Sequence, residues 1–431
     1  MNHSHFDNWT ELLAYFENDE LAAKVWVEKY ALKSSKGKYL EFVPSDMHKR
    51  LAKEFFRIEK KYVENDKHHK DLSEYGKERK PLNYKKIFNF FNEFKYLIPQ
   101  GSVMSNLGAT NQFSSLSNCV VLPDVFDSYG GILFSDQQLA QLFKRRCGVG
   151  IDISSLRPIY EGVQNSAITT SGAVSFMQRF SNTTREVAQQ GRRGALMITM
   201  DVRHPEILEF IHSKKELKKI TGANISVKIT NDFMRSVREN KSFVLQWPID
   251  AIDPKLKREV KAKDIWNQII ISAHGSGEPG VLFWDQQHAY STSSIYPQYK
   301  NTSTNPCSEI AMQGGDSCRL MAINLYSFVE NPFHKTAAFN FEKLYEVAYE
   351  GMRLMDNLVD LELEHITTIL EKINTDSQPN FIKDAEKRTW ELLYKNCIEG
   401  RRVGLGFTGL ADALAALGVG YASEDARLKI D

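Results

Sequence analysis

The sequence predicts a parallel α/β fold that follows an N-terminal helical region. From about residue 100 onward, short β-prone runs alternate with helical stretches, and this alternation favours a parallel sheet. The β-prone runs are CVVL (119–122), VGIDI (149–153), ALMITM (195–200) and FVLQW (243–247). Residues 341–361 place apolar side chains on one helical face, so a helix is expected there.

Residues 1–100 are predicted to be helical. One apolar stripe recurs at steps of 4, 4, 3 and 4 residues, and its members are Met47, Leu51, Phe55, Ile58 and Tyr62. Ser45 lies just before this stripe and is expected to cap the helix. The charged residues 64–81 are expected to form a solvated loop or a frayed helix end.

Composition and charge exclude several classes of protein. The chain has 431 residues, of which 42% are apolar and 25% charged, as in globular proteins. Its net charge of +1 provides no global field for nucleic acid or an anionic membrane. The most apolar window, 403–422, contains Asp412 and five glycines, so we expect it to be buried rather than membrane-spanning. The N-terminus lacks a signal pattern, and a cytoplasmic location is expected.

The five cysteines are few and widely spaced. They are Cys119, Cys147, Cys307, Cys318 and Cys397. This usage is typical of a reducing compartment, where cysteines stay as thiols, bind metal or do chemistry. The chain has no CxxC pair, so no structural metal site is expected.

The segment NTSTNPCSEIAMQGGDSCRL (301–320) concentrates groups that can do chemistry. If it is extended, Asn305, Cys307 and Glu309 share one face, because side chains alternate along a strand. That face would carry an amide, a thiol and a potential general base. Gly314 and Gly315 then predict a turn before Cys318. Taken alone, Cys307 more readily predicts a buried, inert packing role, the commoner one for a free cysteine.

Six motifs in this order resemble the large catalytic subunit of ribonucleotide reductase. They are LSNCVVLPDVFDSYGGI (116–132), KRRCGVGIDISSLRP (144–158), SGAVSFMQRFSNTTREVAQQGRRGALMIT (171–199), KITGANISVKITNDFM (219–234), NPCSEI (305–310) and RRVGLGFTGLADALAALG (401–418). The resemblance implies an N-terminal helical domain (1–100) and an incomplete ten-stranded α/β barrel, about its first half (101–431). It also implies the reduction of ribonucleotides to 2′-deoxyribonucleotides for DNA synthesis.

The resemblance assigns catalytic roles residue by residue. Cys307 would hold the thiyl radical, Glu309 would act as base toward the 3′-hydroxyl, and Asn305 would hydrogen-bond the ribose. Cys119 and Cys318 would be the dithiol that delivers two electrons and leaves as a disulfide.

The resemblance also implies sites for substrate and effector. Ser102 and Asn118 would line the substrate site. Asp127 and Arg157 would form an allosteric site for a deoxynucleoside triphosphate or ATP. Gln189 and Arg193, in the glycine-containing segment AQQGRRG, would report the bound effector to the substrate.

The cofactor and partners follow from the same resemblance. PQGSVMSNLG, TTREVAQQGRRGALM and TGANISVKI look more like the adenosylcobalamin-dependent class, the alternative being a radical from a di-metal small subunit. The resemblance covers only the first part of the barrel, so a complementing C-terminal chain is expected. A homodimer and a thioredoxin- or glutaredoxin-like reductant are also expected.

Two other functions are open on the sequence alone. GLGFTG (404–409), with Glu424 and Asp425 about 20 residues on, matches the fingerprint of a nicotinamide-dependent dehydrogenase. CIEGRRV before it does not look like a buried strand, which argues against that function. The other alternative is a non-catalytic nucleotide-binding fragment, since half a barrel could keep the effector site and lose the chemistry.

Overall fold

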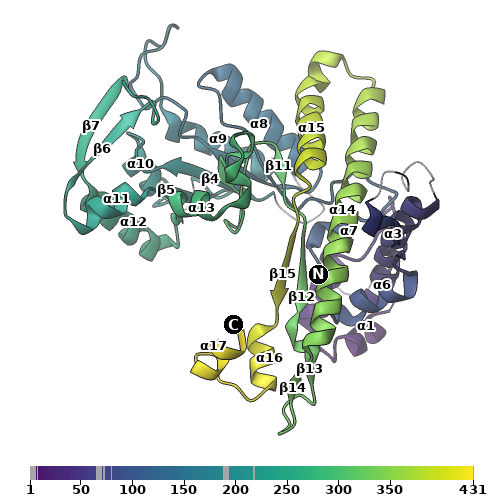
Figure 1. Cartoon of the computed structure of the whole chain (residues 1–431). Coiled ribbons are helices and arrows are strands. Elements are labelled where there is room, and N and C mark those ends of the chain that lie inside the picture. The colour runs from purple at the N-terminus through teal and green to yellow at the C-terminus, as the bar shows by residue number, and fades with distance from the viewer. Residues whose placement is uncertain are drawn as a thin grey trace. The chain divides into compact units, whose positions relative to one another are not determined.

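The computed structural model describes residue 6 and residues 8–64, 70, 73–78, 80–187, 194–216 and 219–430 (Figure 1). The chain forms two compact units. The first unit comprises Met1–Asn118, Cys318–Ile369 and Cys397–Asp431, and the second comprises Cys119–Ser317 and Leu370–Asn396. Each unit contains its own sheet.

The first unit begins with a helical layer. Its helices are α1 (Trp9–Tyr15), α2 (Glu20–Lys29), α3 (Pro44–Glu64), α5 (Glu74–Glu78), α6 (Tyr84–Phe91) and α7 (Gly101–Asn106). The stripe predicted on α3 is confirmed, because Met47, Leu51, Phe55 and Ile58 are all fully buried.

The helix α3 starts earlier than expected, which corrects the predicted cap. It begins at Pro44, so Ser45 lies inside its first turn. The Asp46 carboxylate accepts the N–H groups of Phe42 and Val43 there, at 3.2 and 3.4 Å. Ser45 instead donates its hydroxyl hydrogen to Asn92 Oδ1 at 2.9 Å. Proline is favoured at the first helical position, so the helix begins at Pro44, one residue before Ser45.

A three-stranded sheet completes the first unit. Its strands are β1 (Leu97–Pro99), β12 (Leu320–Asn324) and β15 (Gly404–Thr408). β12 pairs antiparallel with β1 and parallel with β15. The helix α14 (Phe341–Thr375) runs alongside β12 and β15 (Figure 1), and an atom added at Gly351 would lie 3.2 Å from Leu97 and Leu405. The helix predicted over 341–361 is therefore confirmed.

The second unit is built on a six-stranded sheet in the order β11-β2-β3-β4-β5-β8. Five of its strands are parallel and follow one another along the chain: β2 (Cys119–Val121), β3 (Gly148–Asp152), β4 (Leu196–Asp201), β5 (Asn224–Ile229) and β8 (Gly280–Phe283). Helices separate these strands, as the α/β prediction requires: α8 (Tyr129–Phe143), α9 (Ala173–Glu186), α10 (Ile207–His212), α11 (Asn231–Arg238) and α12 (Ala262–Ser276). Every residue of β3 and β4 is buried.

Two features of the second unit differ from a simple parallel barrel. The predicted run FVLQW lies in β6 (Ser242–Trp247), which pairs antiparallel with β7 (Leu256–Lys261) outside the six-stranded sheet. It alternates buried and exposed positions, whereas β3 and β4 are buried on both faces. The described strands of the main sheet leave two ends, β11 (Asp316–Ser317) and β8, and do not close into a barrel.

The remaining elements are short, apart from one helix. They are α13 (Trp284–Tyr290), α15 (Asn380–Gly400), α16 (Leu410–Ala416), α17 (Glu424–Ile430), β9 (Ser303–Thr304), β10 (Ala311–Met312), β13 (Val329–Glu330) and β14 (Ala338–Phe339). Among the described helices, none combines the length and the apolar character needed to cross a membrane.

The GLGFTG segment does not form a dinucleotide-binding turn. A dinucleotide fingerprint needs its glycines in the loop between a strand and a helix. Here Gly404 and Gly406 lie inside β15, which pairs with β12 along its whole length. Only Gly409, with φ of 73°, lies at the turn before α16. The geometry therefore does not support the dehydrogenase alternative.

Candidate active site

Cys307 lies at the tip of a β-hairpin formed by β9 and β10. Thr304 pairs with Ala311, and Ser303 pairs with Met312. Asn305 closes the connecting loop, because its N–H donates to Ile310 O and its Oδ1 accepts the Ile310 N–H, each at 3.1 Å. We call residues 303–312 the cysteine hairpin.

The cysteine hairpin corrects the expectation that Asn305, Cys307 and Glu309 share one face. The loop is not extended, since Ser308 has φ of 70° and its N–H bonds back to Asn305 O at 3.0 Å. Asn305 is fully buried, while Cys307 and Glu309 are exposed. The turn predicted at Gly314 and Gly315 is observed.

A buried polar network holds the cysteine hairpin against the centre of the sheet. Ser303 Oγ lies 2.9 Å from Thr199 Oγ1 on β4, and Thr199 donates its own hydroxyl hydrogen to Asp152 Oδ2 at 2.7 Å. Because Thr199 has only one hydroxyl hydrogen, Ser303 must supply the hydrogen between the two hydroxyls. The hairpin is thereby linked to the carboxylate of Asp152 on β3.

A buried ion pair completes this network. Lys228 Nζ on β5 lies 2.8 Å from Asp152 Oδ2 and donates to Thr302 O at 3.3 Å. Burial alone would lower the pKa of the Lys228 ammonium, but the Asp152 and Asp201 carboxylates outweigh it, so its pKa is raised. The ammonium therefore stays charged and bridges the sheet to the strand entering the hairpin.

Glycine at position 150 allows the hairpin to approach the sheet closely. A Cβ atom built at Gly150 on β3 would lie 1.8 Å from Thr304 O, and contacts under 3.0 Å essentially never occur. Any other residue would push β9 off the sheet. The absence of a side chain at Gly150 therefore allows Thr304, the residue before Asn305, to lie directly against β3.

The second unit brings Asn305 and Cys119 together. Cys119 is the first residue of β2 and is half-buried. Asn305 Nδ2 lies 3.7 Å from Cys119 Sγ, within the range of a weak hydrogen bond to sulfur. Because the other amide atom of Asn305 binds Ile310, the side chain connects the hairpin loop to this thiol.

The first unit holds Cys318, Ser102 and Asn118. Asn118 Oδ1 accepts the Ser102 N–H at 2.8 Å, at the start of α7. Cys318 is buried, with its Sγ 4.0 Å from Gln100 Oε1. Gln100 also donates from Nε2 to Leu116 O and to Cys318 O, at 3.2 and 3.3 Å. Ser102 and Asn118 are thus adjacent, and Gln100 connects Cys318 to the segment before Asn118.

A buried carboxylate that the sequence did not single out fixes the segment before Cys119. Glu362 on α14 accepts hydrogen bonds from Ser115 Oγ (2.6 Å), the Leu116 N–H (2.6 Å) and Ser117 Oγ (3.0 Å). The fully buried Arg319 donates to Ser117 Oγ at 3.4 Å. No sequence signal identifies Glu362, because its partners lie 245 to 247 residues away along the chain. Gln100 falls within the segment PQGSVMSNLG, but that segment does not reveal the contacts of its side chain.

Asp127 and Arg157 form an ion pair beside a separate cavity. Arg157 Nε lies 2.8 Å from Asp127 Oδ2, and the Arg157 N–H donates to Asp127 Oδ1 at 3.0 Å. The cavity has a volume of about 240 Å³ and opens at the N-terminus of α8, where Ser128 Oγ accepts the Gly131 N–H. Gln189 and Arg193 lie outside the described residues.

Comparison with known proteins identifies relatives over most of the chain. The ribonucleotide reductase barrel-domain family matches residues 117–430. A vitamin B12-dependent ribonucleoside-diphosphate reductase from Thermoplasma acidophilum is 30% identical, over 94% of this chain and 54% of its own length. The enzyme of the same name from Mycobacterium tuberculosis is 30% identical, over 76% of this chain and 42% of its own.

A more distant relative carries a different name. The ribonucleoside-diphosphate reductase large chain of Neurospora crassa is 25% identical over 72% of this chain and 34% of its own length. The chain spans about half the length, or less, of the curated relatives it matches.

Proposed function

The chain belongs to the ribonucleotide reductase barrel-domain family, and on that premise we propose that it reduces ribonucleotides to 2′-deoxyribonucleotides by thiyl-radical chemistry. The observation that carries the proposal is the cysteine hairpin. Its loop exposes Cys307 and Glu309 and holds Asn305 Nδ2 3.7 Å from Cys119 Sγ. The loop thus carries an exposed thiol and a carboxylate, and its buried amide reaches a second thiol on β2.

Cys307 is the proposed radical residue. As a thiyl radical it takes the hydrogen atom from C3′ of the ribose, and Glu309 accepts the proton of the 3′-hydroxyl. Asn305 hydrogen-bonds the ribose through the second of its two Nδ2 hydrogens, since the first points to Cys119, and this requires a local movement of the loop because Asn305 is fully buried. Anchoring of the hairpin on Thr199 and Lys228 keeps the thiol in place during the reaction.

Cys119 and Cys318 are the proposed electron donors. Their two thiols give up two protons and two electrons and become a disulfide, while the 2′-hydroxyl leaves as water and C2′ gains a hydrogen. The two Cα atoms must come within roughly 4.4–6.8 Å for that bond to form. Gln100 positions Cys318, and Glu362 positions the segment that leads into Cys119.

Ser102 and Asn118 are proposed to bind the substrate. The first turn of α7 carries backbone N–H groups that have no acceptor within the helix, and Ser102 and Val103 in this turn are buried. Asn118 Oδ1 accepts one of these N–H groups, from Ser102, and so orders the helix start. The Asn118 amide nitrogen remains a donor for the ribose or phosphate.

Adenosylcobalamin is the proposed radical source. The names of the Thermoplasma acidophilum and Mycobacterium tuberculosis relatives support it, since each is called vitamin B12-dependent. When bound, it supplies an organic radical by cleavage of its cobalt–carbon bond. The exposed position of Cys307 on a hairpin tip fits this, because the thiol can be reached from outside the sheet. Cleavage of the cobalt–carbon bond, monitored by visible absorption spectroscopy, distinguishes this radical source from a di-metal small subunit.

The cavity beside Asp127 and Arg157 is the proposed effector site. A deoxynucleoside triphosphate or ATP would place a polar group against this ion pair. Gln189 and Arg193 are proposed to carry the identity of the base to the substrate site. Arg157 is also held by Gly162 O at 2.6 Å, so its guanidinium is already oriented.

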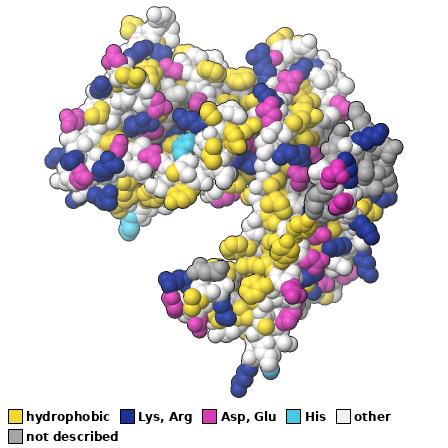
Figure 2. All heavy atoms as spheres, in the orientation of Figure 1, with side chains coloured by type: hydrophobic (Ala, Val, Ile, Leu, Met, Phe, Trp, Pro, Cys, Tyr) yellow, Lys and Arg dark blue, Asp and Glu magenta, His cyan; other side chains and the backbone are white. Residues whose placement is uncertain are grey.

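The family architecture is proposed to be an N-terminal helical domain over 1–100 and the first half of a ten-stranded barrel over 101–431. Five parallel strands that lie side by side in chain order in the second unit, with the β6–β7 hairpin between the fourth and the fifth, support the half-barrel. In the first unit, β15 is an edge strand whose Phe407 is 62% exposed. Figure 2 shows hydrophobic side chains gathered over β15 and β12. We infer that a complementing C-terminal reductase part covers this edge.

The proposed setting is a reducing cytoplasm. There a thioredoxin- or glutaredoxin-like protein would restore the Cys119–Cys318 dithiol after each turnover. We also propose that the functional enzyme is a homodimer, as the family resemblance implies.

The proposal is tested by separating binding from turnover. The chain alone should bind deoxynucleotides and form no deoxyribonucleotide, while the chain with its complementing part, adenosylcobalamin and a dithiol should turn over. Binding without turnover under the complete conditions would favour the non-catalytic alternative. Robust turnover by the chain alone would overturn the need for a complement.

A further inference from the structure

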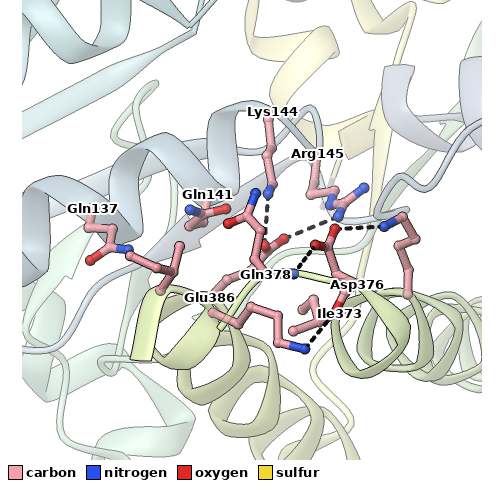
Figure 3. Close-up of a pocket in the computed structure, with 11 residues that line it drawn as sticks. Gln137, Gln141, Lys144, Arg145, Ile373, Asp376, Gln378 and Glu386 are labelled. Atoms are coloured by element: carbon pink, nitrogen blue, oxygen red, sulfur yellow. Dashed lines mark hydrogen bonds and ion pairs between the residues drawn. The ribbon is translucent and has the colours of Figure 1, made fainter. Parts of the chain in front are cut away.

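A second polar cavity lies in the second unit, away from the residues assigned so far. It has a volume of about 390 Å³ and lies between the C-terminal end of α8, the end of α14 and the start of α15 (Figure 3). It shares no lining residue with the cavity beside Asp127. We call it the α8–α15 cavity.

Cations outnumber carboxylates around the α8–α15 cavity. The lining side chains include four cations, Lys144, Arg145, Lys372 and Lys383, and two carboxylates, Asp376 and Glu386. The lining therefore carries a formal charge of +2, which is 4 minus 2. In a chain whose net charge is +1, this is a local concentration of positive charge.

The contacts show where the positive charge is incompletely balanced. Glu386 is shared by two cations, with Lys144 Nζ at 2.7 Å and Arg145 Nη2 at 3.1 Å. Lys383 Nζ contacts only uncharged acceptors among its described hydrogen bonds, Asn374 O at 3.3 Å and Asp376 O at 2.9 Å. Because Lys372 pairs with Asp376 at 2.9 Å, the excess of +2 consists of one of the two cations that share Glu386 and of Lys383.

Amide side chains add neutral polar groups. Gln137, Gln141 and Gln378 line the same cavity. Within the described part of the chain, the buried Gln141 Oε1 has no hydrogen-bond partner. A buried acceptor that lacks a donor is costly, and a rotation of the Gln141 amide toward the cavity would let a ligand hydroxyl satisfy it.

We propose that the α8–α15 cavity binds a small phosphate ester. A phosphate monoester carries a charge of about −1.5 to −2 at neutral pH, which matches the +2 of the lining. Lysine and arginine are the usual phosphate donors, and a ligand hydroxyl would satisfy Gln141. The volume lies within the range of small-molecule sites. Phosphate would bridge Lys144 on the α8 side to Lys383 on α15.

The test uses ribose 5-phosphate as the ligand and isothermal titration of the whole chain at low ionic strength. The wild type should bind it saturably, with inorganic phosphate binding more weakly because it lacks the hydroxyls. Lys383→Gln should weaken binding by about tenfold, since one charge-assisted hydrogen bond is lost and no carboxylate is left unpaired. Lys144→Gln should weaken the binding of ribose 5-phosphate to a similar extent, and this variant replaces Lys383→Gln in the test if Lys383→Gln fails to fold.

Lys387→Gln is the matched control. Lys387 lies on the same helix and does not line the cavity, and its Nζ is 3.8 Å from Glu391. It should leave the affinity unchanged. Absence of saturable binding by the wild type, or equal weakening by Lys387→Gln, would overturn the proposal. These readouts involve no ribonucleotide reduction, so they are independent of the proposed catalytic function.

Discussion

Gly150→Ala is the sharpest perturbation of the cysteine hairpin. The added Cβ would lie 1.8 Å from Thr304 O, and real contacts are at least 3.0 Å, so β9 must retreat by at least 1.2 Å, the difference between the two distances. A displacement of about 1 Å in a catalytic group costs on the order of 100-fold in rate. Overpacking of this kind also costs about 1–3 kcal/mol of stability.

The assay measures deoxyribonucleotide formation by the chain together with its proposed complementing part, adenosylcobalamin and a dithiol, which we call the complete reductase. Urea unfolding of the chain is measured in parallel. We expect Gly150→Ala to lower turnover by about 100-fold while the protein stays folded. Gly275→Ala in α12 is the matched control, because nothing lies within 4 Å of its added Cβ. It should keep wild-type turnover. Near-wild-type turnover by Gly150→Ala would refute the claim that this close approach positions Cys307.

Three further predictions concern buried ionisable groups. Lys228→Met leaves Asp152 buried without its cation and should lower the free energy of unfolding, measured with urea, by about 3–5 kcal/mol. The control Lys241→Met breaks an exposed pair with Glu239 and should lower it far less. Equal losses of stability in the two variants would contradict the buried network. Burial raises the pKa of Glu206 to about 7, so the folded state keeps a proton that the unfolded chain releases above about pH 4.5. Wild-type stability should therefore fall relative to Glu206→Gln as pH rises from about 4.5 to 7, by on the order of 2–3 kcal/mol, and parallel curves would refute this. Burial lowers the pKa of His48 to about 4, so the wild type should lose stability relative to His48→Phe as pH falls from about 6.5 to 4, measured by the same unfolding series.

The regular elements could be predicted because local patterns determine them. The stripe from Met47 to Tyr62 follows helical spacing, and α3 buries it. The runs at 119–122, 149–153 and 195–200 are strands of one parallel sheet. FVLQW is also a strand, but its composition could not show that its partner is β7 rather than the main sheet. Pairing depends on neighbours that a single segment does not encode.

The geometry of the candidate site was less predictable. The motif around Cys307 supplied the residues of the proposed chemistry, which remain a prediction, but the alternation inferred from it assumed an extended chain. The Ser308 N–H instead bonds back to Asn305 O in a turn, and Ser308 has a positive φ, which its residue type does not favour. In this turn Asn305 is buried and Cys307 is exposed. Glu362 contacts Leu116 across 246 residues of sequence, and no local pattern reports such a contact.

The most direct test of the thiyl-radical account is a single turnover without external reductant. The complete reductase is given adenosylcobalamin and ribonucleotide, and deoxyribonucleotide and disulfide-linked peptides are counted by mass spectrometry. The account predicts one deoxyribonucleotide for each new Cys119–Cys318 disulfide, and neither product from Cys307→Ser. Product formed without that disulfide, or an active Cys307→Ser enzyme, would contradict it.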